Sequence, residues 1–175
     1  MKKVLIAAMS VDGKIAESAD QLSLDWTSKE DTRFFIDKTK EIGTLVMGST
    51  TFVTIGKPLP RRRIIVMSKD NTLAPRFPLL EQTPQEGTVE YANMSVEDLV
   101  EALGAQGIDS LAIVGGSSIY SQFLQVGLVT DMYLTVEPIL FGSGVPLASG
   151  FDRIEMKLVD STKLGEHGVL LHYQI

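Results

Sequence analysis

An aspartate lies among aromatic residues in the stretch "LDWTSKEDTRFF" (24–35), where Asp31 follows Trp26 and precedes Phe35. Ionised carboxylates are rarely buried unless a partner offsets the loss of water. Asp31 and Phe35 are four residues apart, so in a helix they share one face. One interpretation is that a ligand supplies the partner of Asp31. The other is a helix cap, because Ser28-x-x-Asp31 fits a capping box and acidic residues favour the first helical turn.

Three consecutive arginines end the segment "GKPLPRRR" (56–63), in which Pro58 and Pro60 stiffen the chain. Side chains directly before a buried strand cannot all point inward. The run is therefore either a solvated turn or the source of one guanidinium that binds a carboxylate or phosphate through two parallel hydrogen bonds.

Small and hydroxylated residues follow three of the apolar runs. The first run ends in Gly48 to Thr51, the second in Ser68 and Lys69, and the third in Gly115 to Ser118. Free amide groups at a helix N-terminus, with glycines that allow close approach, are suited to phosphate. Two such turns predict a seat for the two ends of a dinucleotide. The GxGxxG fingerprint is absent, and a tight turn that needs a positive φ explains the glycine pair equally well.

The composition removes several classes of chemistry. The 175 residues include no cysteine, GxSxG elbow, P-loop or HExxH motif, so thiol, serine and zinc hydrolysis have no candidate residues. His167 and His172 have no acidic partner at metal-ligand spacing, so we predict structural histidines and no metal site. The net charge of −6 opposes broad binding to nucleic acid. The first apolar run is too short for a signal peptide, and we expect a cytoplasmic protein without membrane spans.

Apolar runs alternate with helical patterns through most of the chain, and runs without polar alternation are typical of parallel strands covered on both faces. The predicted strands cover residues 4–9, 44–48, 64–68 and 110–116. The predicted helices cover residues 28–43, 95–107 and 117–127, with a short helical pattern after residue 48. The end of the chain predicts longer strands at 131–142, 153–165 and 168–175, the last two joined as a hairpin.

This order of elements predicts one α/β domain over residues 1–175. Its central sheet is mostly parallel and flanked by helices, with antiparallel strands at the C-terminal end. Residues 70–88 contain Pro75, Pro78 and Pro84 and are predicted to be irregular.

Taken in order, the motifs resemble those of the dihydrofolate reductase family over most of the chain. The matching segments are "LIAAMSVDGKIA", Trp26 with Asp31 and Phe35, "MGSTTF", "IGKPLPRR", "GGSSIY" and "YLTV". The segment "EPILFGSGVPL" (137–147) is more similar to the related pyrimidine reductase of riboflavin biosynthesis, which shares fold and cofactor, and "MSVDGKIA" also leans that way.

The resemblance implies NADPH-dependent reduction of 7,8-dihydrofolate, with hydride transfer to C6 and protonation of N5. Asp31 would be the catalytic group, and Arg62 would bind the glutamate carboxylate of the substrate. The implied substrate-binding residues are Ile6, Ala8, Phe35, Ile55, Leu59, Arg62, Val114 and Thr135. The implied NADPH-binding residues are Ala8, Ile15, Gly48, Ser49, Thr50, Thr51, Ser68, Lys69, Gly115, Gly116, Ser117, Ser118, Ile119 and Tyr120. Lys69 is expected to bind the 2′-phosphate, because Ser49 stands where many relatives carry an arginine.

Three functions stay open at this point. The first is dihydrofolate reductase. The second, favoured by "FGSGVPL", is a riboflavin-pathway pyrimidine reductase or another NADPH-dependent reductase of the same superfamily. The third is a non-catalytic nucleotide-binding module, which would need no carboxylate in a substrate pocket. We expect a small-molecule substrate, no nucleic-acid or membrane partner, and either a monomer or a homodimer.

Overall fold

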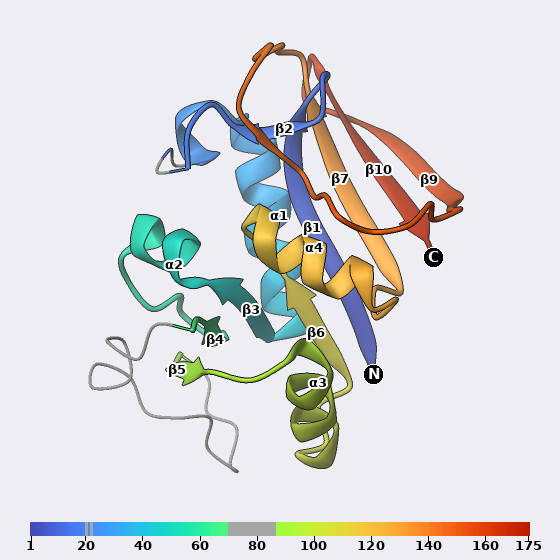
Figure 1. Ribbon diagram of the computed structural model, residues 1–175. Helices are drawn as coiled ribbons and strands as arrows, with labels where there is room; N and C mark the ends of the chain where they lie inside the picture. The colour runs from blue at the N-terminus through green and yellow to red at the C-terminus, as the bar shows by residue number, and fades with distance from the viewer. Residues whose placement is uncertain (20, 22, 70–86) are drawn as a thin grey trace.

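An eight-stranded sheet organises the computed structural model, which describes residues 1–19, 21, 23–69 and 87–175 (Figure 1). Its strands are β1 (Lys2–Ser10), β3 (Thr44–Gly48), β4 (Arg63–Met67), β5 (Val89–Ala92), β6 (Ser110–Ile113), β7 (Asp131–Glu137), β9 (Lys157–Leu164) and β10 (Gly168–Gln174). Across the sheet the order is β5-β4-β3-β6-β1-β7-β10-β9. Two short strands, β2 (Lys14–Ala16) and β8 (Val145–Pro146), pair separately.

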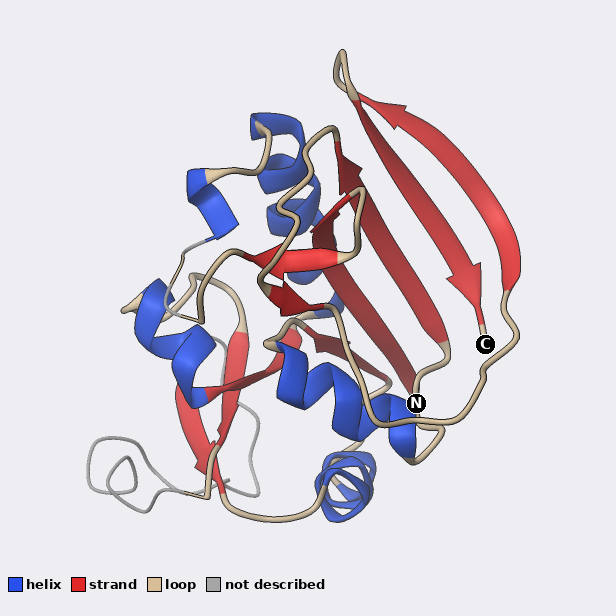
Figure 2. Ribbon diagram, turned by 45° about the horizontal axis from the view of Figure 1, so that its top comes forward, coloured by secondary structure: helices blue, strands red, loops and turns tan. Residues whose placement is uncertain are grey.

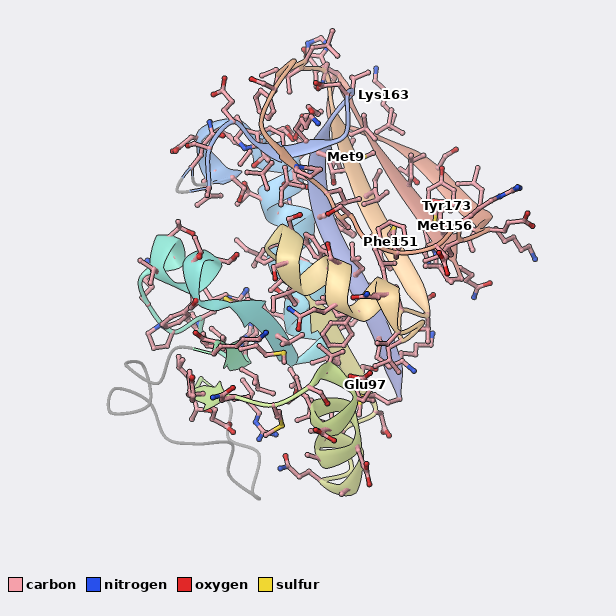
Figure 3. All side chains as sticks on the ribbon, viewed as in Figure 1. Met9, Glu97, Phe151, Met156, Lys163 and Tyr173 are labelled. Atoms are coloured by element: carbon pink, nitrogen blue, oxygen red, sulfur yellow. The ribbon has the colours of Figure 1, made fainter. Side chains whose placement is uncertain are left out.

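The strands from β5 to β7 are parallel, whereas β10 is antiparallel to β7 and β9 is antiparallel to β10. The predicted fold class is therefore confirmed: a mostly parallel central sheet with antiparallel C-terminal strands. Figure 2 shows the β9–β10 hairpin at one edge of the sheet. Met156 and Tyr173, labelled in Figure 3, lie at this strand-rich edge, and Met156 is exposed.

Four α-helices lie within the described residues: α1 (Lys29–Ile42), α2 (Ser49–Ile55), α3 (Val96–Ala105) and α4 (Ser117–Gln125). Helix α1 begins after Ser28, whose hydroxyl oxygen accepts a hydrogen bond from the Asp31 amide. The helix ends at Gly43, which has a φ of 82°. Helix α3 begins after Ser95, whose hydroxyl oxygen accepts a hydrogen bond from the Asp98 amide in the same way. The predicted helix starts are confirmed because each serine satisfies an amide that has no partner inside its helix.

Alternate residues of the parallel strands pack against opposite layers of helices. Leu5 of β1 belongs to the core under α3 and α4, whereas its neighbour Ile6 packs with Phe35 of α1. Because side chains alternate across a strand, burial on both faces requires an apolar residue at nearly every position. This explains the continuous apolar runs in the sequence.

The structure shortens three predicted strands and adds three strands that were not predicted, β2, β5 and β8. Strand β9 begins at Lys157 rather than at residue 153. Strand β7 ends at Glu137 rather than at residue 142, since Pro138 has no amide hydrogen to continue the ladder. Strand β6 ends at Ile113, before the glycine turn. Strand β5 was not predicted, because its Glu90 reads as a surface residue but is 3% exposed. The predicted irregular region at 70–88 lies, for residues 70–86, outside the described residues.

The two histidines occupy different environments in the C-terminal hairpin. The His172 ring stacks on Tyr133 with centroids 4.2 Å apart, and its Nε2 lies 3.1 Å from Asp131 Oδ1. His167 is exposed beside Glu166. Across the described part of the chain, no group of three or more His, Asp and Glu residues is arranged to hold a metal. Nor does any described helix combine the length and apolar character needed to cross a membrane.

Candidate active site

A cavity of about 1410 Å³ opens at the carboxyl ends of the parallel strands. Its walls come from the ends of β1, β3, β4, β5 and β6, from the first turns of α2 and α4, and from one face of α1. This is the place where ligands bind in open α/β sheets, since the strand-to-helix turns converge there.

Asp31 faces this cavity from the first turn of α1, where hydroxyl groups hydrogen-bond its carboxyl group. Burial raises the pKa of Asp31 above the ordinary 3.8. The Thr135 and Thr27 hydroxyls bind the ionised form and oppose this rise in pKa, whereas the negative charge of Glu137 adds to it. The carboxyl group therefore takes up a proton more readily than an exposed aspartate.

The capping interpretation of Asp31 holds for its backbone only. Ser28 Oγ accepts from the Asp31 amide at 3.2 Å, as in a capping box. The box is not closed, however, because the Ser28 amide donates to Glu137 Oε1 at 2.7 Å. The Asp31 carboxyl group is left to line the cavity, so both readings of the sequence describe part of the structure.

Apolar residues and one arginine line the part of the cavity near α1. Arg62 is only 4% exposed, and its Nε donates to Pro60 O at 3.2 Å. Its Nη1 donates to Thr39 Oγ1 at 3.0 Å. Within the described part of the chain, these bonds leave the Nη2 hydrogens for an anion. Burial lowers the pKa of Arg62, and Arg61 adds to the effect, but a guanidinium remains charged at neutral pH.

The three arginines take three different positions. Arg61 is exposed and has a φ of 59°. Arg63 is buried in a two-bond ion pair, in which Nε and Nη2 donate to Glu90 at 2.6 and 2.8 Å. The solvated-turn interpretation thus fits Arg61 alone, while Arg62 faces the cavity and Arg63 joins β4 to β5.

The glycine turns after β3 and β6 form one continuous wall. The Gly48 amide donates to Gly115 O at 2.8 Å. A Cβ on Gly116 would lie 3.2 Å from Thr51 Oγ1, so a side chain there would crowd the start of α2. Gly115 has a φ of 117°, which glycine adopts without strain. Two helix starts lined with hydroxyl groups are thereby held side by side, an arrangement that fits the pyrophosphate of a dinucleotide such as NADPH.

Tyr120 lies in the same wall, but its hydroxyl group is already engaged. It donates to Ile6 O at 2.7 Å, and burial, with a smaller effect of Asp31, raises the pKa of the phenol. The tyrosine therefore stays neutral and offers its ring to the cavity, while its hydroxyl ties α4 to β1.

The structure brings nearly all the predicted site residues to this one cavity. Those that line it are Asp31, Ile6, Ala8, Ile15, Phe35, Gly48, Ser49, Thr50, Thr51, Ile55, Leu59, Arg62, Ser68, Lys69, Val114, Gly115, Gly116, Ser117, Ser118, Ile119 and Tyr120. Thr135 is 1% exposed and reaches the site through the Asp31 carboxyl group. Their assignments to substrate, cofactor and catalysis stay predictions.

A profile of the RibD C-terminal domain matches residues 2–170. The chain belongs to this family. The uncharacterized protein YwjB of Bacillus subtilis is 24% identical over 98% of this chain and 97% of its own length.

Solved structures share the fold of this RibD C-terminal domain at low identity. A diaminohydroxyphosphoribosylaminopyrimidine deaminase/5-amino-6-(5-phosphoribosylamino)uracil reductase from Thermotoga maritima has a TM-score of 0.78 and 17% identity, covering 99% of this chain and 56% of that one. Dihydrofolate reductase from Enterococcus faecalis, solved with NADP(H), has a TM-score of 0.74 and 23% identity over 99% and 95% of the two chains. The predicted resemblance to the dihydrofolate reductase superfamily is confirmed.

In this RibD C-terminal domain, the segment 137–147 is attached to the first loop, residues 11–13 between β1 and β2. Asp12 accepts from Phe141 N and Gly142 N at 3.1 and 2.8 Å, and Ser10 Oγ donates to it at 2.7 Å. These donors lower the pKa of Asp12, the Ser10 hydroxyl most strongly. The first loop leads into β2, whose Ile15 lines the cavity, and the segment 137–147 thus holds this loop in place.

Sequence reasoning missed three residues of the site. Thr27 lines the cavity itself, Thr39 binds Arg62, and Glu137 binds Ser28 and acts on Asp31 through its charge. Glu137 had a usable signal: it follows Thr135 by two residues in a strand, so both point to the same face. Thr39 lies four residues after Phe35 on the same helix face. The sequence marks Thr27 as a possible N-cap beside Ser28, but not as a residue of the site.

Proposed function

We propose that the chain is an NADPH-dependent reductase of a substrate that joins a flat nitrogen heterocycle to an anionic tail, and that this substrate is the ribosylamino-pyrimidine of the riboflavin pathway. The observation that carries the proposal is the convergence of three unlike groups on one cavity. These are the Asp31 carboxyl group, the Arg62 guanidinium and the hydroxyl-lined starts of α2 and α4.

Helix α1 sets the length of the ligand that fits. Asp31, Phe35 and Thr39 follow one another at four-residue intervals, and Thr39 binds Arg62. At about 1.5 Å of rise per residue, Asp31 and the anchor of Arg62 lie about 12 Å apart along the helix. A ring bound at Asp31 can therefore present a phosphate or carboxylate to Arg62 when a linker such as a ribosyl group joins them.

The side chains prepare a C=N bond beside the ring for reduction. In the proposed pyrimidine substrate this bond forms when the ribosylamino group opens, between its nitrogen and the first carbon of the sugar, and the uracil ring itself stays unreduced. NADPH, bound along the wall formed by residues 48–51 and 115–120, would supply the hydride to that carbon. Asp31 accepts hydrogen bonds from ring N–H or amino groups, and Phe35 contacts the ring face. When positive charge develops on the C=N nitrogen, the carboxylate stabilises it, an effect of about 3 kcal/mol for a preorganised group. Because its pKa is raised, the same carboxyl group can also hold the proton that this nitrogen takes up.

Dihydrofolate is the second candidate substrate. It is favoured by the combination of Asp31, Phe35 and Arg62 with the "GKPLPRR" segment. The pyrimidine is supported by the family of the chain and by the segment 137–147, which attaches to the first loop through Asp12.

The deciding experiment follows NADPH oxidation by absorbance with two substrates in parallel. We expect turnover of 5-amino-6-(5-phosphoribosylamino)uracil, lowered at least about a hundredfold in Asp31→Asn. Faster turnover of 7,8-dihydrofolate would select the second candidate. No turnover of either, with NADPH binding retained in a fluorescence titration, would reject both substrates and leave a reductase of another substrate or the non-catalytic nucleotide-binding module.

A further inference from the structure

We propose that Glu137 is a positioning residue of this site, because its buried carboxylate binds Ser28 in place of Asp31 and leaves the Asp31 carboxyl group in the cavity. The proposal deepens the proposed reductase function and rests on it for its catalytic consequence. It concerns an acidic residue at the end of β7, the first residue of the segment 137–147, to which the sequence assigned no role in the site.

The hydrogen bonds of Ser28 define what Glu137 does. Both the amide and the hydroxyl of Ser28 donate to Glu137 Oε1, each at 2.7 Å. The same hydroxyl oxygen accepts from the Asp31 amide at 3.2 Å. In a closed capping box the side chain of the third helical residue, here Asp31, would bind the Ser28 amide. The Ser28 amide already donates its hydrogen bond to Glu137, so the Asp31 side chain does not bind the start of its own helix.

Strand β7 places two different groups against the same carboxyl group. Thr135 and Glu137 are two residues apart and point to one face of the strand. Thr135 hydrogen-bonds the Asp31 carboxyl group. Glu137 is buried, with 4% of its surface exposed. A buried carboxylate needs hydrogen-bond donors, and the two Ser28 donors meet this need. The position of Asp31 is thus set by one strand as well as by its own helix.

The charge of Glu137 acts in the same direction as burial. The groups that face Asp31 are the hydroxyls of Thr27 and Thr135, the Tyr120 phenol of α4 and Glu137. Glu137 is the group among these that carries a formal charge at neutral pH. By Coulomb repulsion it favours the protonated form of Asp31, so it contributes to the raised pKa.

A smaller cavity of about 490 Å³ lies on the other side of Glu137. It is lined by Glu30, Glu166 and His167 as well as by Trp26 and Ser28. His167 and Glu166 are largely exposed, so solvent screens their charges. The repulsion felt by Asp31 therefore comes chiefly from the buried carboxylate of Glu137.

Helix α3 offers a matched comparison within the same chain. Ser95 Oγ accepts from the Asp98 amide at 3.1 Å, so the capping serine and the third helical residue are the same as in α1. Asp98 is exposed to solvent. The cap alone therefore leaves an exposed carboxylate, whereas at the start of α1 Glu137 of β7 binds the capping serine and Thr135 of β7 binds the Asp31 carboxyl group.

The test uses an isosteric variant, Glu137→Gln, which keeps an oxygen for the Ser28 donors but removes the charge. Carbon NMR of the carboxyl groups is used to titrate Asp31, assigned by the signal lost in Asp31→Asn. We expect the titration midpoint of Asp31 to move to lower pH in Glu137→Gln and to stay in place in the control Asp98→Asn. An unchanged or higher midpoint in Glu137→Gln would overturn the proposal.

A second variant, Glu137→Leu, removes the acceptor as well. We expect its turnover to fall at least about a hundredfold, as in Asp31→Asn, whereas Glu137→Gln stays within about tenfold of wild type. Equal turnover in wild type and both variants would overturn the proposal. The NMR titration needs no substrate, so failure of the reductase function in the absorbance assay leaves the Glu137 test intact and separately readable.

Discussion

Arg62 Nη1 donates a hydrogen bond of 3.0 Å to Thr39 Oγ1, and this bond joins the turn before β4 to helix α1. Thr39 is fully buried and lies eight residues after Asp31 in the same helix. One rigid helix therefore fixes both the carboxyl group and the guanidinium of the candidate site. Any shift of α1 moves both ends of the ligand site together.

Arg62→Leu is expected to raise the KM for the anionic substrate by about 10- to 100-fold with a smaller effect on kcat. A hydrogen bond to a charged group contributes about 1.5–3 kcal/mol, and this contact is made in the ground state as well as the transition state. Steady-state kinetics on the active substrate measures the two constants. The matched control is Arg61→Leu, since Arg61 is exposed; an equal rise in KM there would contradict the assignment.

Arg63 is not a suitable control, because its replacement should unfold the protein more readily. Arg63→Met removes the buried two-bond ion pair with Glu90, and breaking such a pair costs about 3–5 kcal/mol of the free energy of unfolding. The double variant Arg63→Met with Glu90→Leu removes both charges and should recover most of that loss. Urea denaturation compares the variants. A loss in the double variant as large as in Arg63→Met would contradict this explanation.

The ionised Asp31 carboxyl group should lower the free energy of unfolding at neutral pH. Its pKa is raised, so the folded state binds the proton more tightly than the unfolded chain does. The contribution of this group to stability is then present below the ordinary pKa of 3.8 and is lost as the pH rises through the raised pKa. We expect Asp31→Asn to have the same or a higher Tm than wild type at neutral pH, with the difference shrinking in acid.

The matched control for Asp31 is Asp98→Asn at the start of α3. Its carboxylate is exposed at the same helix position, where negative charge contributes about 0.3–1 kcal/mol, so this variant should be slightly less stable at neutral pH. Thermal unfolding followed by circular dichroism compares the two variants. A clear loss of stability in Asp31→Asn would return Asp31 to the role of a helix cap.

The sequence allowed the sheet to be predicted because its signals are local. Buried strands such as residues 44–48 need apolar side chains on both faces, and serines mark the starts of α1 and α3. The glycine and hydroxyl turns were visible for the same reason. Their convergence followed from the rule that the ends of parallel strands share one edge.

What the sequence could not show are partners that lie far apart along the chain. Glu137 binds Ser28 across 109 residues, and Arg63 binds Glu90 across 27. Such pairs change the meaning of a residue: Glu90 reads as a surface acid until Arg63 is placed beside it. The three arginines look alike in sequence, and only the packing of α1 and β5 separates their roles.

Gly144→Ala should detach the segment 137–147 from the first loop and β2. A Cβ at Gly144 would collide with Ala16 O, and the residue has a φ of 133°. Strand β2 carries Ile15 into the cavity, so kcat/KM should fall together with stability. In the control Gly142→Ala, a Cβ meets no described atom within 4 Å and only the φ of 73° is strained, at about 1–2 kcal/mol. Similar losses in both variants would contradict the collision.

Lys69→Ala should weaken the preference for NADPH over NADH by roughly fivefold, as expected for an exposed ion pair of about 1 kcal/mol. Lys69 lines the cavity just after β4, whose neighbour in the sheet is β3 with the first glycine turn at its end. Fluorescence titration with each nucleotide measures the two Kd values. Lys57→Ala serves as the comparison, since Lys57 also lines the cavity but follows α2. If the ratio is unchanged in Lys69→Ala, another group binds the 2′-phosphate.

The central place of β1 has a consequence for how the protein is made. Its partners in the sheet begin at Ser110 and Asp131, so during synthesis β1 stays unpaired until β6 and β7 have also been made. Contacts between residues so distant in sequence slow folding, and an apolar strand that is exposed meanwhile favours aggregation. Nascent chains that stop before β6 should therefore depend on chaperones to remain dispersed.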